Sequence, residues 1–355
     1  MKKTVFILIL SAILCIMSVI VHGVGIANVN ATGYSEIVIE QSSGRVLYSN
    51  DADRKRPMAS TTKIVTAITA IENYKGDMHD IVEVPAEAVG IEGSSLYLKR
   101  GEKLEFIDLM YGLMLRSGND CAVSVAILTG GSVARFADMM NETAKKAGAV
   151  SSHFVNPHGL HDDDHYTTAA DLALITAYAM RNDLFREIVS AKKYVTHRSG
   201  DAEQTIYNKN KLLSSYEGAC GVKTGYTIKA GRCLVSAATR GGMTVIAVVL
   251  NCGPMFEECA RLMDKAFENY EMKNLVPEGV LSYCKDENGK LIALKACGEL
   301  LYPVKKGVFE PAEYIISDVG VVPKNAESGF ENGKLDIYFD KQLLFSVKLV
   351  TIYVR

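Results

Sequence analysis

The chain has 355 residues, of which 48% are hydrophobic and 23% are charged, a composition typical of a globular protein large enough for two domains. The formal net charge is −2, and the first 31 residues contribute two lysines and no acid to it. Because basic residues are not in excess, nucleic acid is not expected as a partner.

The N-terminal segment is predicted to be an export signal. Lys2 and Lys3 precede an uncharged apolar run from Val5 to Val21, and small residues lead up to Ala31. We expect residues 1–31 to be removed as a signal peptide, and retention as an N-terminal membrane anchor is the alternative. In both cases the rest of the chain is expected on the cell-wall side of the cytoplasmic membrane, either secreted or held at its outer face by the N-terminal segment.

The next segment predicts a β-hairpin followed by a helix. Ser35–Glu40 and Arg45–Ser49 alternate apolar and polar residues on either side of a Ser-Ser-Gly turn. A helix is then expected to run to about Asn73, with Ser60 in its first turn. Because residues three apart share a helical face, Ser60 and Lys63 can meet.

The middle of the chain is predicted to be mainly helical, after a short strand near Val82–Val84. Four helices are expected, over Leu104–Leu115, Asp120–Leu128, Ser132–Gly148 and Thr168–Arg181. The loop over residues 153–165 holds His153, His158 and three consecutive aspartates. We expect the two histidines to be structural and the aspartates to be solvated rather than bound to a cation.

Strand patterns return after residue 218. Strands are predicted over Ala219–Thr224, Cys233–Thr239 and Thr244–Asn251, and an amphipathic helix over Phe256–Tyr270. Strands therefore open and close residues 32–274 and helices fill their middle, which predicts an α+β fold with an antiparallel sheet and helical layers. Residues 275–355 contain only short strands and turns, so a small all-β domain of the sandwich kind is expected there.

Three short motifs carry the chemistry. They are Ser60-x-x-Lys63, Ser117-Gly118-Asn119 between two helices, and Lys223-Thr224-Gly225 at the end of a strand. A serine becomes a nucleophile when a base takes its proton, and a lysine can be that base only when it is neutral. Burial or a second cation lowers a lysine pKa, and we expect Lys223 to be that cation. Each motif alone is weak, whereas the three in this order indicate nucleophilic catalysis.

The motifs match the set found in class A β-lactamases and penicillin-binding proteins, with S-G-N in place of S-D-N. Five segments match further, namely Met58–Lys63, Gly93–Ser95, Leu113–Asp120, His153–Leu160 and Gly221–Gly225. Over Tyr34 to Tyr270 the chain resembles the low-molecular-mass penicillin-binding proteins, the serine D-alanyl-D-alanine carboxypeptidases. The resemblance implies a β-lactamase/DD-peptidase-like catalytic domain at 32–274, and the tail at 275–355 resembles the second domain of these enzymes.

The resemblance also implies roles for single residues. Ser60 would attack the penultimate D-alanine, Lys63 would accept its proton, and Ser117 would relay a proton to the leaving group. Substrate binding would fall to five further residues, Lys223, Asn119, Thr224, Gly225 and Tyr226. The substrate would be a peptidoglycan stem peptide ending in D-Ala-D-Ala, β-lactams would be covalent inhibitors, and neither a metal nor another cofactor is expected.

One feature departs from the family pattern. The arginine that often follows the strand pair after the third motif is absent, because none occurs in residues 251–260. Arg232 or Lys229 could bind the substrate carboxylate instead.

Three alternatives remain open. A class A β-lactamase needs a glutamate for deacylation, and none lies between Glu142 and Glu187, which disfavours that activity. A DD-endopeptidase would use the same residues, and a non-catalytic peptidoglycan-binding protein would keep only the fold. The seven cysteines after the signal have no metal-site spacing, so mostly buried free thiols are expected.

Overall fold

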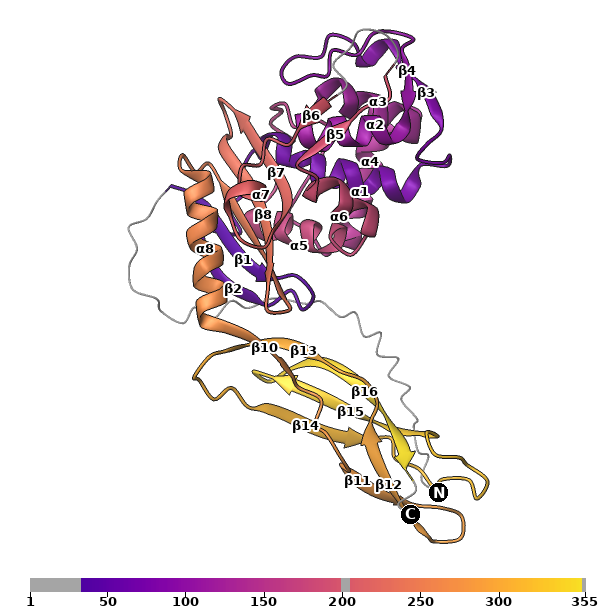
Figure 1. Ribbon diagram of the computed structural model, residues 1–355. Coiled ribbons are helices and arrows are strands. Elements are labelled where there is room, and N and C mark those ends of the chain that lie inside the picture. The colour runs from indigo at the N-terminus through magenta and orange to yellow at the C-terminus, as the bar shows by residue number, and fades with distance from the viewer. Residues whose placement is uncertain (1–32, 199–204, 353–355) are drawn as a thin grey trace, which may run out of the picture. The chain divides into compact units, whose positions relative to one another are not determined.

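The computed structural model describes residues 33–198 and 205–352 (Figure 1). The predicted signal peptide lies outside the described residues. The fold is α+β, as predicted, with an antiparallel sheet and helical layers followed by an all-β part.

The central sheet has five antiparallel strands in the order β2-β1-β9-β8-β7. These strands are β1 Ser35–Glu40, β2 Val46–Asn50, β7 Ala219–Thr227, β8 Gly231–Arg240 and β9 Met243–Leu250. The predicted hairpin and the three later strands are thereby confirmed. Strand β7 lies at the edge of the sheet and carries the third motif, with Lys223 opposite Val235 on β8.

The two faces of the sheet pack against different helices. Because side chains alternate along a strand, Ile37 and Ile39 enter the large core beneath the helical layer. Val38 lies on the opposite face, in a second core with Leu262 of helix α8, Met255–Asn269. Figure 1 shows α8 running alongside the sheet.

The helical layer contains most of the elements between β2 and β7. They are η1 Ala59–Thr62, α1 Lys63–Asn73, η2 Ala86–Ala88, α2 Phe106–Tyr111, η3 Gly112–Arg116, α3 Asn119–Gly130, α4 Val133–Lys146, α5 Ala169–Ala179, α6 Asp183–Ser190 and α7 Leu212–Ser215. Two small hairpins accompany them, β3 Ile81–Glu83 with β4 Lys103–Glu105, and β5 Lys193–Val195 with β6 Thr205–Tyr207.

Most of the predicted helices are confirmed, and one differs in kind. Helix α4 starts where predicted, and Ser132 caps it, because its side chain accepts a hydrogen bond from the Arg135 N–H. The segment Leu104–Leu115, predicted as one helix, begins in strand β4 and ends in the π-helical turn η3. The sequence did not predict α6, α7 or the β5–β6 hairpin.

The C-terminal part is all-β, as predicted. Its strands are β10 Tyr270–Asn274, β11 Ser282–Lys285, β12 Leu291–Ala296, β13 Leu301–Lys305, β14 Ala312–Ser317, β15 Glu331–Phe339 and β16 Gln342–Ile352. They form a two-stranded sheet, β10-β13, and a five-stranded sheet, β11-β12-β16-β15-β14. Val304 of the first sheet and Leu294 and Ile337 of the second share one hydrophobic core, the arrangement expected of a sandwich.

Within residues 33–198 and 205–352, no single helix has both the length and the apolar composition needed to cross a membrane, and α3 and α4 meet that test only as a bent pair. The same residues contain no group of side chains that could hold a metal ion. The seven cysteines of residues 33–198 and 205–352 are free thiols, five of them buried, with Cys220 half-buried and Cys297 exposed.

Candidate active site

Ser60 lies in a strained turn at the start of helix α1. The preceding residue, Ala59, has φ +50°, in the left-handed region that residues with a Cβ rarely adopt. Two threonines hold the turn, since Thr61 Oγ1 donates to the Met58 carbonyl at 2.7 Å and Thr62 Oγ1 to the Ala59 carbonyl at 2.8 Å. The first turn is therefore a 3₁₀ turn, η1, that fixes the position of the serine.

Lys63 is fully buried beneath Ser60. Its Nζ lies 3.1 Å from Ser60 Oγ, 2.7 Å from Asn119 Oδ1 and 2.8 Å from the His158 carbonyl oxygen. Burial is the largest cause that lowers its pKa, to about 7, and the positive charge of Lys209 lowers it further. Near neutral pH a large fraction of Lys63 is therefore the free amine, in hydrogen-bonding contact with the hydroxyl.

Lys223 is also fully buried, on strand β7, where its Nζ donates to the Thr224 carbonyl at 2.9 Å. Burial lowers its pKa well below the usual lysine value, and the charges of Lys63 and Lys209 add to the effect. This differs from the expectation that Lys223 keeps Lys63 neutral. Burial is the larger cause, and Lys209 is the cation that acts on Lys63.

Lys209, which lies between β6 and α7, was not predicted from the sequence. Its Nζ donates to Ser94 Oγ at 2.9 Å, and burial lowers its pKa. Two flanking asparagines hold this segment, because Asn208 Nδ2 donates to the Ala191 carbonyl at 3.0 Å and Asn210 Nδ2 to the Gly221 carbonyl at 2.7 Å. The Asn-Lys-Asn triplet is the sequence signal that could have located this cation.

The second motif lies where η3 gives way to α3. Ser117 is buried with φ +66°, a left-handed residue that ends the π-helical turn. Asn119 is held by backbone on two sides, since its N–H donates to the Ser94 carbonyl at 2.7 Å and its Nδ2 to the Glu92 carbonyl at 2.5 Å. Among the described residues, the Ser117 side chain makes no hydrogen bond to Lys63 or Lys223.

Asp120 organises the loop that faces the second motif, a role that the sequence did not predict. This buried carboxylate accepts hydrogen bonds from Ser95 Oγ at 2.6 Å, from the N–H groups of Leu96 and Leu98 at 3.1 and 3.0 Å, and from Cys121 N–H at 2.9 Å. The loop thereby holds the two carbonyl groups that position Asn119.

Gly225 brings strand β7 against the serine turn. A Cβ at this position would lie 3.0 Å from Ser60 N and 3.1 Å from both Met58 O and Thr61 N. Contact between two backbones therefore requires the glycine, apart from the part in substrate binding that the resemblance implies for it. Tyr226 follows on the same strand edge with 65% of its surface exposed, and Thr224 is half-buried.

A family model described as D-alanyl-D-alanine carboxypeptidase matches residues 23–253. The chain belongs to the D-alanyl-D-alanine carboxypeptidase family. The resemblance to low-molecular-mass penicillin-binding proteins is thereby confirmed.

Relatives and solved structures agree with this family assignment. The D-alanyl-D-alanine carboxypeptidase DacF of Bacillus subtilis is 32% identical over 243 residues, which cover 67% of this chain and 62% of the relative. The chain thus spans less than two thirds of that relative. Penicillin binding protein 5 from Haemophilus influenzae has a TM-score of 0.74 at 25% identity, with 92% of this chain and 98% of that one covered. The Streptomyces K15 DD-transpeptidase has a TM-score of 0.61 at 36% identity, with 66% and 96% covered.

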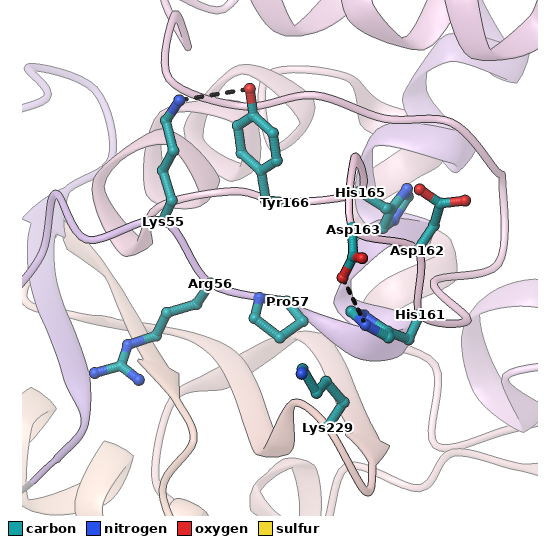
Figure 2. A pocket seen from close by; sticks show the side chains of 9 residues that line it. All are labelled: Lys55, Arg56, Pro57, His161, Asp162, Asp163, His165, Tyr166 and Lys229. Carbon is teal, nitrogen blue, oxygen red and sulfur yellow. Dashed lines mark hydrogen bonds and ion pairs between the residues drawn. The ribbon is translucent and has the colours of Figure 1, made fainter.

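Arg232 and Lys229, the two basic residues that could replace the missing family arginine, lie outside the three motifs of this carboxypeptidase-family chain. Arg232 lies opposite Tyr226 on β8, and its Nη1 is 3.5 Å from the Gly253 carbonyl. Lys229 lies in the β7–β8 turn and lines a separate pocket (Figure 2). The positive charge of Lys209 lowers the pKa of both Lys63 and Lys223, so this cation influences the first and the third motif.

The loop over residues 153–165 supports the family motifs with its backbone. Thr66 Oγ1 donates to the Pro157 carbonyl at 2.7 Å, and a Cβ on Gly159, which has φ +90°, would lie 2.0 Å from Ala59 O. His158 contributes its carbonyl to Lys63, and burial followed by the Lys63 charge lowers the pKa of its ring to about 3. His153 contacts the Asp164 carbonyl at 2.6 Å, so both histidines sit as structural loop residues.

Proposed function

We propose that this chain is an exported serine-type D-Ala-D-Ala carboxypeptidase that removes the terminal D-alanine of peptidoglycan stem pentapeptides through an acyl-enzyme on Ser60. The supporting observation is the 3.1 Å contact between Ser60 Oγ and Lys63 Nζ, a buried amine with a pKa of about 7. Residues 1–31 would be the signal peptide or an anchor, 32–274 the catalytic domain and 275–355 the accessory β domain.

The proposed acylation uses the free amine of Lys63. Lys63 takes the Ser60 proton as Oγ bonds to the carbonyl carbon of the penultimate D-alanine, and a tetrahedral oxyanion forms. The N–H groups of Ser60 and Tyr226 would stabilise this oxyanion, and one such donor is typically worth about 10²–10³ in rate. When the C–N bond breaks, the Ser117 hydroxyl would pass a proton to the departing D-alanine nitrogen.

Substrate binding would use the edge of β7. An extended peptide can pair with that edge, with the Asn119 side chain on its other side. Its terminal carboxylate would lie near Lys223 and Thr224, and Lys209 would supply the positive charge that the missing arginine supplies in relatives. A water molecule then hydrolyses the ester and restores Ser60.

Penicillin is expected to acylate Ser60 in the same way and to leave slowly. The absence of a glutamate between Glu142 and Glu187 supports this, because fast deacylation in class A β-lactamases requires one. Glu187 itself accepts a hydrogen bond from Tyr111 Oη at 3.0 Å, on helix α6.

Release of D-alanine from a muramyl-pentapeptide tests the proposal. The wild type should release D-alanine and Ser60→Ala should not, while Ser42→Ala in the β1–β2 turn serves as the matched control. Intact-mass measurement after benzylpenicillin should show a persistent adduct in the wild type alone. Rapid return to the unmodified mass would favour the β-lactamase, and release by Ser60→Ala would exclude the serine mechanism.

Acyl transfer to an amine is a second candidate, because the Streptomyces K15 relative of known structure is a DD-transpeptidase. If water is the acceptor, adding glycylglycine to the same assay should not change the products, which are D-alanine and the tetrapeptide. A glycylglycine-extended product would instead favour transfer. Cleavage of a D-alanyl cross-linked dimer would likewise identify an endopeptidase.

A further inference from the structure

A cavity of about 330 Å³ lies beside the serine turn and has no role in the acylation described above (Figure 2). Three segments line it, namely residues 55–57 before Ser60, residues 161–163, 165 and 166 of the supporting loop, and Lys229 in the β7–β8 turn. Its size lies within the roughly 300–1,000 Å³ of small-molecule sites. A side chain of a substrate could therefore enter it.

A substrate paired with β7, as proposed above, would extend toward this cavity. Lys229 is four residues beyond Gly225, whose Cβ position is 3.0 Å from Ser60 N. A strand advances about 3.3 Å per residue, so these four residues span at most roughly 13 Å. With the terminal carboxylate near Lys223 and the penultimate D-alanine at Ser60, the preceding residue of an antiparallel peptide points toward this end of β7.

The loop side of the cavity is joined to the serine turn through His165. His165 is buried, and its Nε2 lies 2.9 Å from Thr62 Oγ1, the hydroxyl that donates to the Ala59 carbonyl. The cavity and the nucleophile are thus built on the same two segments.

Charged side chains of both signs line the cavity, and they differ in whether other residues of the chain already bind them. Arg56 is engaged outside the cavity, with Nη2 3.0 Å from Asp51 Oδ2 and Nε 2.6 Å from Ser35 Oγ. Lys55 lies over the Tyr166 ring, 4.4 Å from its centre. Within the part of the chain that the structure describes, Lys229 has no hydrogen bond or ion pair and is exposed.

An acid lies on the loop side of the cavity. Figure 2 shows Lys229 on the strand side of the cavity, with His161 and Asp163 on the loop side. The Asp163 side chain is 99% exposed and 3.3 Å from His161 Nε2, so its carboxylate remains open to another cation. A ligand group that combines an anion with a cation would satisfy both walls.

We propose that this cavity binds the side chain of the residue that precedes the penultimate D-alanine, and that it selects a side chain ending in both an ammonium and a carboxylate group. Lys229 binds the carboxylate and Asp163 binds the ammonium. A simple ammonium side chain satisfies only Asp163, and an apolar one satisfies neither. This inference rests on the proposed function, because it assumes that the peptide is acylated at Ser60.

Three synthetic pentapeptides test the inference, identical except for meso-diaminopimelate, L-lysine or norleucine before D-Ala-D-Ala. The measurement is kcat/KM for D-alanine release. Exposed ion pairs contribute up to about 1 kcal/mol each, which is about fivefold in rate. We expect the diaminopimelate peptide to exceed the norleucine peptide by about fivefold or more, with the lysine peptide between them.

Two variants locate the preference. Lys229→Met should bring the diaminopimelate peptide down to the level of the lysine peptide, and Asp163→Asn should remove the advantage of lysine over norleucine. Lys75→Met, at an exposed lysine beyond the end of α1, is the matched control and should leave all three ratios unchanged.

Equal rates for the three peptides in the wild type, or unchanged ratios in Lys229→Met, would overturn the inference. Release from none of the peptides would instead reject the proposed function. Acylation by benzylpenicillin, which lacks the preceding residue, should be the same in Lys229→Met as in the wild type, and a loss there would show that the variant damages the serine turn.

Discussion

The catalytic and C-terminal parts of the chain differ in where they keep their charges. Around the serine, Lys63, Lys223 and Asp120 are fully or almost fully buried. The C-terminal part has ion pairs at the surface, such as that between Lys348 and Glu331, whose side chains are 68% and 60% exposed. Burying a charge costs free energy unless other groups compensate, whereas surface pairs change stability little. Changes of charge should therefore have large effects in the first part and small effects in the second.

Loss of the buried amine should have the largest effect. Lys63→Met keeps most of the volume of the side chain and removes the proton acceptor of Ser60. General-base contributions are typically 10²–10⁴ in rate, so we expect acylation by benzylpenicillin to fall about 10³-fold. Stopped-flow or gel-based acylation measures this fall. Acylation within tenfold of the wild type would exclude Lys63 as the base.

Removal of the Asp120 carboxylate should be the next largest effect. Asp120→Ala leaves the buried N–H groups of Leu96, Leu98 and Cys121 without this acceptor, and each unpaired donor costs about 1–3 kcal/mol. We expect the free energy of unfolding in urea to fall by at least about 3 kcal/mol. Asp120→Asn keeps one oxygen acceptor and should lie between Ala and wild type. Equal stability of all three proteins would show that the carboxylate does not hold the loop.

The pH dependence of acylation should follow Lys63. Because burial lowers the pKa of this lysine from 10.5 to about 7, the free amine predominates above pH 7 and the charged form below it. The rate of acylation should therefore fall about tenfold per pH unit below 7 and level off above it. Benzylpenicillin acylation between pH 5 and 9 measures the profile. A flat profile across this range would contradict a lysine base.

A smaller effect is expected from the support of the serine turn. Val155 N–H donates to His165 Nδ1, so the ring proton lies on Nε2 and donates to Thr62 Oγ1. Thr62→Val removes this contact and the hydrogen bond to the Ala59 carbonyl, each worth about 1 kcal/mol. We expect kcat to fall about tenfold with little change in KM, because Thr62 positions the serine without touching substrate.

The matched control is Thr69→Val on the same helix. Thr69 Oγ1 is buried and has no hydrogen-bond partner among the described residues, so its loss should leave kcat unchanged. A similar fall in kcat in both variants would assign the effect to general disturbance of α1.

The smallest effect is expected from a substitution on the surface of the C-terminal part. Lys348→Ala removes the exposed pair with Glu331 and should change the free energy of unfolding by less than about 0.5 kcal/mol. D-alanine release should be unchanged. A loss above about 2 kcal/mol would remove the contrast between the two parts of the chain.

The sequence could predict whatever depends on local pattern. The alternation in β1 and β2, the apolar face of α1 and the short spacing of Ser60 and Lys63 are local features, and the structure agrees with each. Strand β13 was not predicted, since it contains Pro303, which weakens a strand pattern. Strand β4 falls within a predicted helix because its partner β3 lies about 20 residues away, beyond the reach of a local pattern.

Non-local contacts explain what was missed at the site. Lys209 follows a segment with no motif, and only the fold brings it to the first motif of the chain. The resemblance implied a part in substrate binding for Gly225, but its contact with the Ser60 backbone depends on how β7 packs against η1. Three of the donors to Asp120, from Ser95, Leu96 and Leu98, lie more than 20 positions earlier, and no local pattern links them.

At Gly159 and Gly225, backbone rather than a side chain packs against the turn that holds Ser60. A peptide group is the same whichever amino acids supply it, so most substitutions nearby leave the shape of this turn untouched. The rest of the surface can then change in sequence while the Ser60 hydroxyl keeps its position. This is in keeping with the TM-score of 0.74 at 25% identity to penicillin binding protein 5 from Haemophilus influenzae. A saturation library should accordingly tolerate few replacements at 159 and 225 and many at the exposed Ile228.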